Sequence, residues 1–301
     1  MFKNLTLYRI GPDWAPDLLA AGAALEKTAF IPCAATQPIS IGWVPPRGHA
    51  NGPLLESIGG QWLAKLAIEQ KLLPGSVVKR RVDDLSAHIE KQTGRKPGKK
   101  EKRDIKDQAV LELLPQAFTR DAQLRVWINP VERLLAIDAA SAARADEAVT
   151  LLVKALDNFA VAPLQTQVSP AAAMSDWLVS GEPHAAFSVD RECELKSTDE
   201  SKAAVRYARH ALDIDEVRQH IAHGKRPTRL AITWQGRVSL VLTETMQLRK
   251  LDFLDVTMED RPHAPDADAA FDADAALATG ELGRLIPDLI DALGGEGAAI
   301  G

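Results

Sequence analysis

The sequence predicts an α+β protein in which mixed or antiparallel sheets pack against helices and a basic helical hairpin is inserted between sheet-forming segments. Two observations support this fold class. Apolar and polar residues alternate along short segments before residue 75 and again after residue 115, and this period of two is typical of strands. Between these regions, apolar residues recur every three or four positions, as they do on one face of a helix.

The composition is that of an ordinary globular protein, since 46% of its 301 residues are hydrophobic and 26% are charged. This length allows two or three domains. No segment reaches the roughly 18 consecutive apolar residues that a membrane-spanning helix requires, and the amino terminus alternates where a signal peptide would be continuously apolar. Cys33 and Cys193 form no CxxC motif, so no zinc site or disulfide framework is indicated. We expect a cytoplasmic protein that uses no metal and no cofactor.

The first sheet region is predicted to contain three strands and one helix. The strands cover residues 2–10, 40–46 and 61–69, and the helix covers residues 12–26. A loop rich in glycine, proline and asparagine, residues 45–53, precedes the third strand. Pro74 and Gly75 then end the region.

The helical hairpin follows. Its first helix begins near Val78 and is broken by the glycines and the proline of residues 94–98, and its second helix covers residues 99–114 until Pro115 stops it. Residues 79–106 hold 11 Lys/Arg against 5 Asp/Glu, a balance of +6 in a chain of net charge −5, so all other residues together sum to −11. Such a local excess of positive charge indicates a polyanionic partner.

The hairpin segment contains no Trp, Tyr or Phe. Proteins that bind single strands place aromatic rings under the bases, so a basic surface without rings favours phosphate contacts on a duplex. A solvated hairpin whose lysines only maintain solubility is the open alternative. The residues predicted to contact DNA here are Lys99, Lys100, Lys102 and Arg103.

After the hairpin the strand period returns. Residues 123–129 and 133–138 are predicted to form a β-hairpin, and residues 142–156 a helix. Residues 161–169 are the best linker candidate. The predicted organisation is therefore a central α+β domain formed by residues 1–76 and 116–165, an inserted helical tip of residues 77–115, and an α+β base domain of residues 170–301.

The base domain is predicted to alternate strands and helices. Helices are expected at residues 174–179, 214–222 and 270–293, and strands at residues 186–189, 192–196, 205–208, 229–234, 238–243 and 248–253. Residues 252–296 hold 12 Asp/Glu and 2 Lys/Arg, so we expect this region to face away from DNA.

A second basic cluster lies between residues 206 and 229. Lys225 and Arg226 follow a predicted helix, where the helix dipole alone would favour cations. That explanation does not extend to Arg209, His210 and Arg229, which are expected at strand ends and could line a groove. All five residues are candidate DNA contacts.

One pattern in the base domain supports an enzyme instead. Glu192, Glu194 and Lys196 are expected on one strand, and metal-dependent nucleases use two carboxylates to hold Mg²⁺ and a lysine to orient water. Three-residue patterns of this kind are common by chance on exposed strands. A Mg²⁺-dependent nuclease is therefore the alternative function, and incubation of circular duplex DNA with Mg²⁺ would distinguish it.

Several longer segments together resemble the RdgC family of bacterial recombination-associated proteins along nearly the full length. They include FKNLTLYRI from Phe2, IGWVPPRG from Ile41, LLPQAFTR from Leu113, SDWLVSG from Ser175 and HIAHGKRPTRLAITW from His220. By this resemblance, we expect a non-enzymatic homodimer that closes into a ring around duplex DNA, associates with the nucleoid, and limits the access of the RecA recombinase to DNA. Binding is expected to be largely independent of sequence.

The resemblance also assigns individual positions. The family's lysine and glutamine on the strand that lines the hole fall on Arg209 and His210, and the aromatic residue at the contact between the two projecting ends falls on Phe118. The basic residue that a relative carries two positions before this aromatic is Gln116 here. A protein that uses its basic hairpin on RecA itself is a third possible function.

Overall fold

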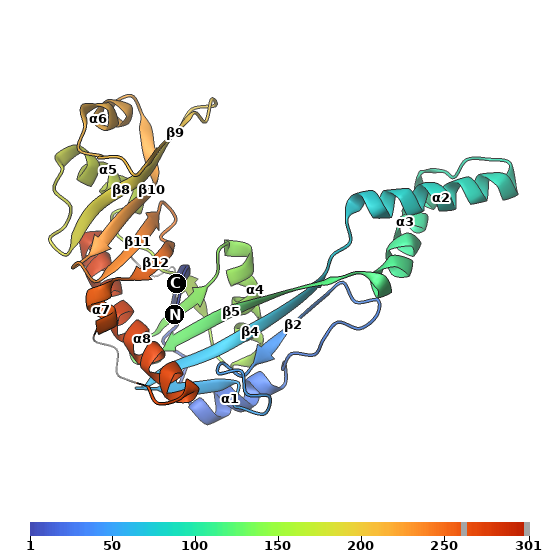
Figure 1. The fold of residues 1–301 in the computed structure, drawn as a ribbon, viewed down its shortest axis with the longest axis horizontal. Coiled ribbons are helices and arrows are strands. Elements are labelled where there is room, and N and C mark those ends of the chain that lie inside the picture. Colours follow the sequence, from blue (N-terminus) through green and yellow to red (C-terminus); the bar gives the residue numbers. More distant parts are fainter. Residues whose placement is uncertain (260–263, 298–301) are drawn as a thin grey trace. The chain divides into compact units, whose positions relative to one another are not determined.

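The computed structural model describes residues 1–259 and 264–297 and confirms an α+β fold with antiparallel strand pairing (Figure 1). The chain divides into two compact units. Unit 1 comprises Met1–Lys27, Pro45–Ala64 and Leu124–Gly301, and unit 2 comprises Thr28–Val44 and Lys65–Gln123. The domain limits predicted from the sequence stay a prediction, as does the insertion of the tip.

Unit 1 contains a long antiparallel sheet. Its strand order is β9-β8-β10-β11-β12-β1-β6, and the end of β5 (Thr119–Asn129) pairs with β6. The strands are β1 (Leu5–Ile10), β6 (Leu134–Asp138), β8 (Phe187–Ser197), β9 (Ala204–Ala208), β10 (Lys225–Trp234), β11 (Val238–Thr243) and β12 (Leu248–Phe253). Two short strands complete the unit, since β7 (Val161–Pro163) pairs with β1 and β3 (Leu55–Ile58) pairs with the first residues of β4 (Gln61–Lys71).

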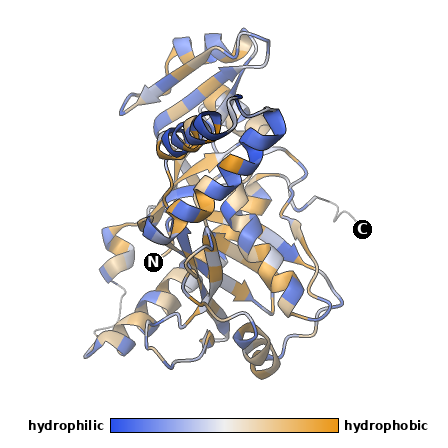
Figure 2. Ribbon diagram, turned by 90° about the vertical axis from the view of Figure 1, so that its right-hand side faces the viewer, coloured by the Kyte–Doolittle hydropathy of each residue, from blue (hydrophilic) through white to orange (hydrophobic). Residues whose placement is uncertain are grey.

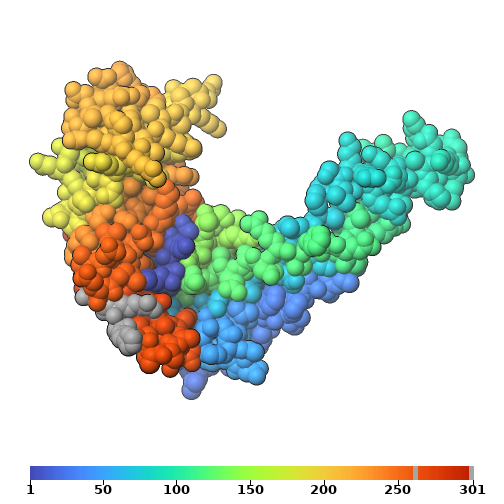
Figure 3. All heavy atoms as spheres, viewed as in Figure 1, coloured from blue at the N-terminus to red at the C-terminus, as the bar shows by residue number. Residues whose placement is uncertain are grey.

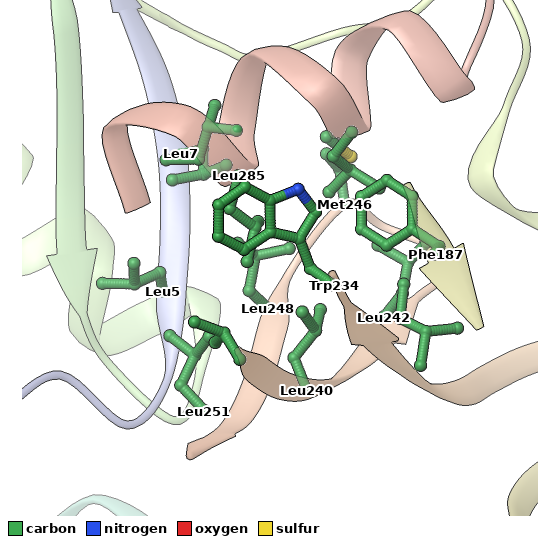
Figure 4. Packing of buried hydrophobic residues seen from close by; sticks show 14 of the residues in the cluster. Leu5, Leu7, Phe187, Trp234, Leu240, Leu242, Met246, Leu248, Leu251 and Leu285 are labelled. Carbon is green, nitrogen blue, oxygen red and sulfur yellow. The ribbon is translucent and has the colours of Figure 1, made fainter. Parts of the chain in front are cut away.

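Helices cover the sheet of unit 1 and close its core. They are α1 (Leu18–Glu26), α4 (Ala142–Ala155), α5 (Pro170–Ser180), α6 (Asp215–Ala222), α7 (Asp255–Glu259) and α8 (Ala267–Ala292). Figure 4 shows Trp234 of β10 packed among Leu7 of β1, Leu285 of α8 and Phe187 of β8. The Trp234 indole is 1% exposed, and its Nε1 donates a hydrogen bond to Asp288 Oδ2 at 2.8 Å. This bond satisfies the ring's single polar group, so the tryptophan is buried without an unpaired donor.

Unit 2 combines strand pairing with the helical hairpin. Strand β2 (Ile39–Val44) pairs with residues 65–70 of β4, and helices α2 (Gly75–Thr93) and α3 (Lys99–Leu113) follow. A short 3₁₀ turn, Leu114–Gln116, leads into β5. The two helices pack through a thin apolar seam in which Val78, Ile105 and Ala109 are buried. Figure 2 shows that these helices are mainly hydrophilic.

Two glycine positions explain local features of the fold. Gly59 and Gly60 both have positive φ, 57° and 81°, and they form the two-residue turn between β3 and β4, a conformation that suits glycine. At Gly42 of β2 a Cβ atom would lie 2.4 Å from the Cα of Phe30, so only glycine permits this approach of the two backbones.

The structure corrects several sequence predictions. Strand β3 falls in a stretch that was expected to form no strand, although the Gly59-Gly60 pair between apolar residues is a hairpin signal. The expected strands 186–189 and 192–196 are one strand, β8, and a bulge opposite Ala231 of β10 interrupts its register. Part of the expected linker is strand β7.

Strand β10 begins four residues earlier than expected. Lys225 and Arg226 therefore lie in the strand, paired with Ser197 and Lys196, and not at a helix end. The positions of Lys225 and Arg226 are set by the sheet, so the helix dipole does not explain them. None of the helices in the part of the chain that the structure describes is long and apolar enough to cross a membrane.

Candidate nucleic-acid interface

The first candidate surface is the solvent face of β8, β9 and β10. Cys193, Tyr207 and Leu230 are buried in the core. Helices α5 and α6 cover that side of the strands (Figure 1). Residues alternate between faces along a strand, so their neighbours point the other way. Directly paired residues share a face, and the register pairs Arg206 and Arg229 with Glu194, and Arg226 with Lys196. We call the set Lys196, Arg206, Arg226 and Arg229 the basic face.

The basic face covers one buried carboxylate, that of Glu194, which is 4% exposed. Lys196 Nζ lies 2.9 Å from Glu194 Oε1, Thr228 Oγ1 donates to the same oxygen at 2.9 Å, and Arg206 Nε donates to Oε2. Burial alone would raise the pKa of Glu194, but these hydrogen bonds lower the pKa to about 2. The carboxylate is therefore ionised and fully paired.

The three cations of β10, Lys225, Arg226 and Arg229, differ in the partners that they have. Arg226 and Arg229 are exposed, and no carboxylate within residues 1–259 and 264–297 forms an ion pair with either. Lys225, which is half-buried, places its Nζ 3.2 Å from Nδ1 of His220. Arg226 and Arg229 are thus the residues of this strand best placed for phosphates, while Lys225 is partly engaged.

Arg209 and His210 directly follow β9 and are both exposed. Arg209 has φ of 56°, a left-handed conformation that is uncommon for a residue with a side chain and clusters at functional sites. The His210 backbone N–H donates to the Arg191 carbonyl at 3.2 Å, and its Nδ1 lies 2.7 Å from the Ala211 carbonyl. Figure 3 shows the β8–β9 hairpin, in yellow to gold, at the surface. Both residues are therefore accessible to a ligand.

The second candidate surface is the beginning of α3 in unit 2. Lys99, Lys100, Lys102 and Arg103 are all exposed, and none forms an ion pair with a residue that the structure describes. Positive charge at a helix amino terminus opposes the helix dipole, so this arrangement costs stability. Residues that break a local stability rule are often functional.

Other charges of the tip are used within it. Glu101 accepts hydrogen bonds from Arg95 at 2.7 and 2.9 Å and from the Gly98 N–H at 3.0 Å, and these bonds lower the pKa of Glu101 to about 2. Arg81 pairs with Glu112 at 2.7 Å. Arg81 and Arg95 thus form ion pairs within the hairpin, whereas the lysines at the beginning of α3 have no ion-pair partner among the described residues. The tip residues belong to unit 2 and those of the basic face to unit 1, so the structure groups the candidates within each unit only.

Phe118 lies just before β5, and its side chain is 85% exposed. Its carbonyl accepts a hydrogen bond from the Leu72 N–H at 2.7 Å, which fixes the backbone while the ring faces solvent. Leu72 is itself 46% exposed. Phe118 is therefore no core residue of this chain.

The pattern that suggested a nuclease does not form a metal site. Lys250 Nζ holds both oxygens of Glu192, at 2.6 and 2.7 Å, while Glu194 is enclosed by Lys196, Arg206 and Thr228. Among the described residues, no group of three or more His, Cys, Asp or Glu is placed to hold a metal ion. Both carboxylates are neutralised by cations of the protein, which leaves them poor ligands for Mg²⁺.

Some acids of the acidic region, residues 252–296, form ion pairs within the fold, and the expectation that this region faces away from DNA stays a prediction. Arg47 pairs with Asp272 at 2.5 Å and with Asp268 at 3.8 Å, and Glu281, which is 2% exposed, accepts two hydrogen bonds of 2.9 Å from Arg237. Several of these acids therefore stabilise the fold and are not a free acidic surface. The part of the region at 260–263 lies outside the described residues.

The acid stability of the protein is expected to depend on Glu194. Its pKa falls from 4.5 to about 2 on folding. Its ion pairs therefore contribute stability that is complete above about pH 5 and is lost as the pH falls from about 5 towards 2. The Glu194→Gln variant lacks this titration. Urea unfolding at about pH 6 and pH 3 should therefore show a smaller loss of unfolding free energy in the variant than in the wild type. An equal loss in both proteins would contradict the assigned pKa.

Comparison with known proteins agrees with the resemblance noted in the sequence. The model of a family described as "Putative exonuclease, RdgC" matches residues 1–296. The chain is 46% identical over 299 residues to recombination-associated protein RdgC of Dechloromonas aromatica and 47% identical over 296 residues to that of Cupriavidus pinatubonensis. It is 43% identical over 300 residues to the protein of the same name from Bordetella pertussis. Each match covers 98% of both chains, and this chain therefore belongs to the RdgC family.

Proposed function

We propose that the protein binds duplex DNA without sequence preference, encircles it as a ring-shaped homodimer, and thereby limits the access of RecA to DNA. It acts in the cytoplasm, in association with the nucleoid, and catalyses no reaction. Its relatives are named recombination-associated proteins, which supports a role at DNA. The ring and the antagonism of RecA rest on the family resemblance.

The basic face is the observation that carries DNA binding. Long cationic side chains on a sheet surface can reach phosphates and release the counterions condensed on a duplex. The aromatic residues of β8, β9 and β10, Phe187, Tyr207 and Trp234, are buried in the core on the other side. The face therefore offers charge and no stacking platform, which favours the backbone of a duplex over unpaired bases.

The proposed dimer contact involves Phe118. An aromatic ring that is 85% exposed is an unusual surface residue, and a two-fold contact between identical projections would bury it. The exposed Leu72, whose backbone is hydrogen-bonded to that of Phe118, would extend the apolar contact. The contact itself is part of the proposal.

The function is tested by measuring affinity for unrelated duplexes over a range of salt concentrations. Each phosphate that the protein neutralises adds about −0.9 to the slope of log K against log salt concentration. Arg229→Ala should therefore make the slope shallower by about one unit, to a similar extent on every sequence. Lys154→Ala removes an exposed lysine of α4 outside both candidate surfaces and should leave the slope unchanged. A loss confined to one sequence would indicate base readout and would contradict the proposal.

The alternatives require separate measurements. Incubation of closed circular duplex DNA with the protein and Mg²⁺ should produce no nicks; nicking that disappears in Glu192→Ala would establish the nuclease instead. Binding to RecA should be lost when DNA is removed by digestion. Persistent binding would favour an interaction protein that contacts RecA directly.

A further inference from the structure

Glu194 lies in an unusual place for a buried carboxylate, because it belongs to the solvent side of the sheet. A charge with 4% exposure needs full compensation, and Thr228 supplies one donor from the neighbouring strand. The other donors come from above, from Lys196 and Arg206, whose side chains are 43% and 72% exposed. The carboxylate therefore binds the inner side of two cations whose outer sides face solvent.

The donor atoms left over define a possible ligand. Arg206 uses Nε for Glu194, and its two Nη groups form no hydrogen bond with any residue described by the structure. Lys196 directs one side of its ammonium group at Glu194 Oε1 and retains donors for another acceptor. The three side chains carry a net charge of +1. An arginine held at Nε presents its terminal N–H groups in a fixed plane, which matches two oxygens of a phosphate.

We propose that Lys196 and Arg206, positioned by Glu194, form a clamp for one phosphodiester group of duplex DNA. The proposal rests on the DNA binding proposed above and adds a site that the sequence pattern did not indicate. Holding both cations before DNA arrives reduces the side-chain entropy that binding would otherwise lose. Glu194 is thus a positioning residue, and Lys196 and Arg206 are the ligands of the phosphate.

The clamp predicts that removal of the acid Glu194 weakens DNA binding, whereas removal of an acid from a basic surface would ordinarily strengthen it. If Glu194 were only a negative charge near DNA, Glu194→Gln would strengthen binding, because the surface would become more positive. If Glu194 positions the clamp, the same substitution releases both cations and weakens binding. The expected loss is about tenfold at low salt, the size of one charge-assisted hydrogen bond.

Glu192→Gln is the matched control. Glu192 is two residues away on the same strand and face and pairs with Lys250, so its removal changes the net charge equally but leaves the clamp intact. This variant should bind duplex DNA as tightly as the wild type or more tightly. Weaker binding by Glu194→Gln together with unchanged or tighter binding by Glu192→Gln would support positioning, and equal effects of the two substitutions would overturn it.

A second pair of variants covers the case in which Glu194→Gln unfolds. Arg206→Lys keeps the positive charge, but a lysine cannot bind Glu194 through one nitrogen and offer two further nitrogens to a phosphate. We therefore expect about tenfold weaker binding of duplex DNA with a nearly unchanged melting temperature. Lys154→Arg, a charge-conserving exchange on α4 outside both candidate surfaces, is the control and should bind like the wild type. Wild-type affinity in folded Arg206→Lys would overturn the clamp. A wild-type protein that fails to bind any duplex would instead refute the proposed function itself.

Discussion

Replacing Lys99, Lys100, Lys102 and Arg103 together by glutamine is expected to weaken duplex binding on the order of a hundredfold at moderate salt. The four cations are exposed at the beginning of α3 and have no ion-pair partner among the residues described. Four lost phosphate contacts would make the salt slope shallower by about three to four units. The measurement is a fluorescence titration of a labelled duplex over a salt series.

The same substitutions are expected to leave stability unchanged or to raise it. Positive charge at a helix amino terminus opposes the dipole, so its removal should gain about 0.3–1 kcal/mol for each residue in the first turn. Loss of binding together with a higher melting temperature would separate function from folding. Arg95→Gln is the control, because Arg95 already pairs with Glu101; it should change the salt slope little but weaken the capping of α3. A quadruple variant that binds normally would confine DNA contact to unit 1.

Phe118→Ser is expected to leave the protomer folded but to shorten its lifetime on closed circular DNA. The ring is 85% exposed, so its removal should not incur the roughly 3–5 kcal/mol that a buried phenylalanine would lose. If Phe118 closes one of the two contacts in a ring, the variant can open there and leave a circle that has no ends. Dissociation should therefore be faster from circles, while binding to short linear duplexes changes little.

Val131→Ser provides the control for this experiment. Val131 is 82% exposed in the turn between β5 and β6, so the substitution removes a comparable exposed apolar side chain from a different place. Its dissociation from circles should match that of the wild type. Dissociation of Phe118→Ser at the wild-type rate would remove Phe118 from the dimer contact, whereas a strongly lowered melting temperature would contradict its observed exposure.

The sequence predicted most elements of the fold and the β5–β6 hairpin, but not the pairing of strands that lie far apart in the chain. Helices α2 and α3 and strands β4, β11 and β12 follow from periodicity and from breakers such as Pro74 and Pro115. The limits of β8 and β10 did not follow from the sequence, because the register shifts in both strands, in β10 between Pro227 and Arg229, and each shift interrupts the alternation that defines a strand. Strand β3 was missed because its apolar residues, Leu55 and Ile58, are three positions apart and do not alternate with a period of two.

The candidate site was predictable only where charge density revealed it. Arg226 and Arg229 were found in a basic cluster, and the lysines of α3 in another. Lys196 was assigned to a nuclease pattern because its neighbours in sequence are acids, but in space it also lies opposite Arg226 and shares Glu194 with Arg206. That difference depends on the register between β8, β9 and β10, which pairs residues far apart in the chain. Alternation along β9 could have placed Arg206 on the solvent face, but not opposite Glu194.

The cations of the basic face are not equally free to change during evolution. Glu194 is buried beneath Lys196 and Arg206, so loss of either cation leaves a carboxylate short of a donor and costs on the order of 1–3 kcal/mol of folding stability. Proteins lie close to the stability threshold below which they fail. Selection for a folded chain would therefore preserve these two charges even if the proposed DNA binding were relaxed. Arg226 and Arg229, which no described carboxylate needs, are the positions where a lineage can change its affinity without that loss.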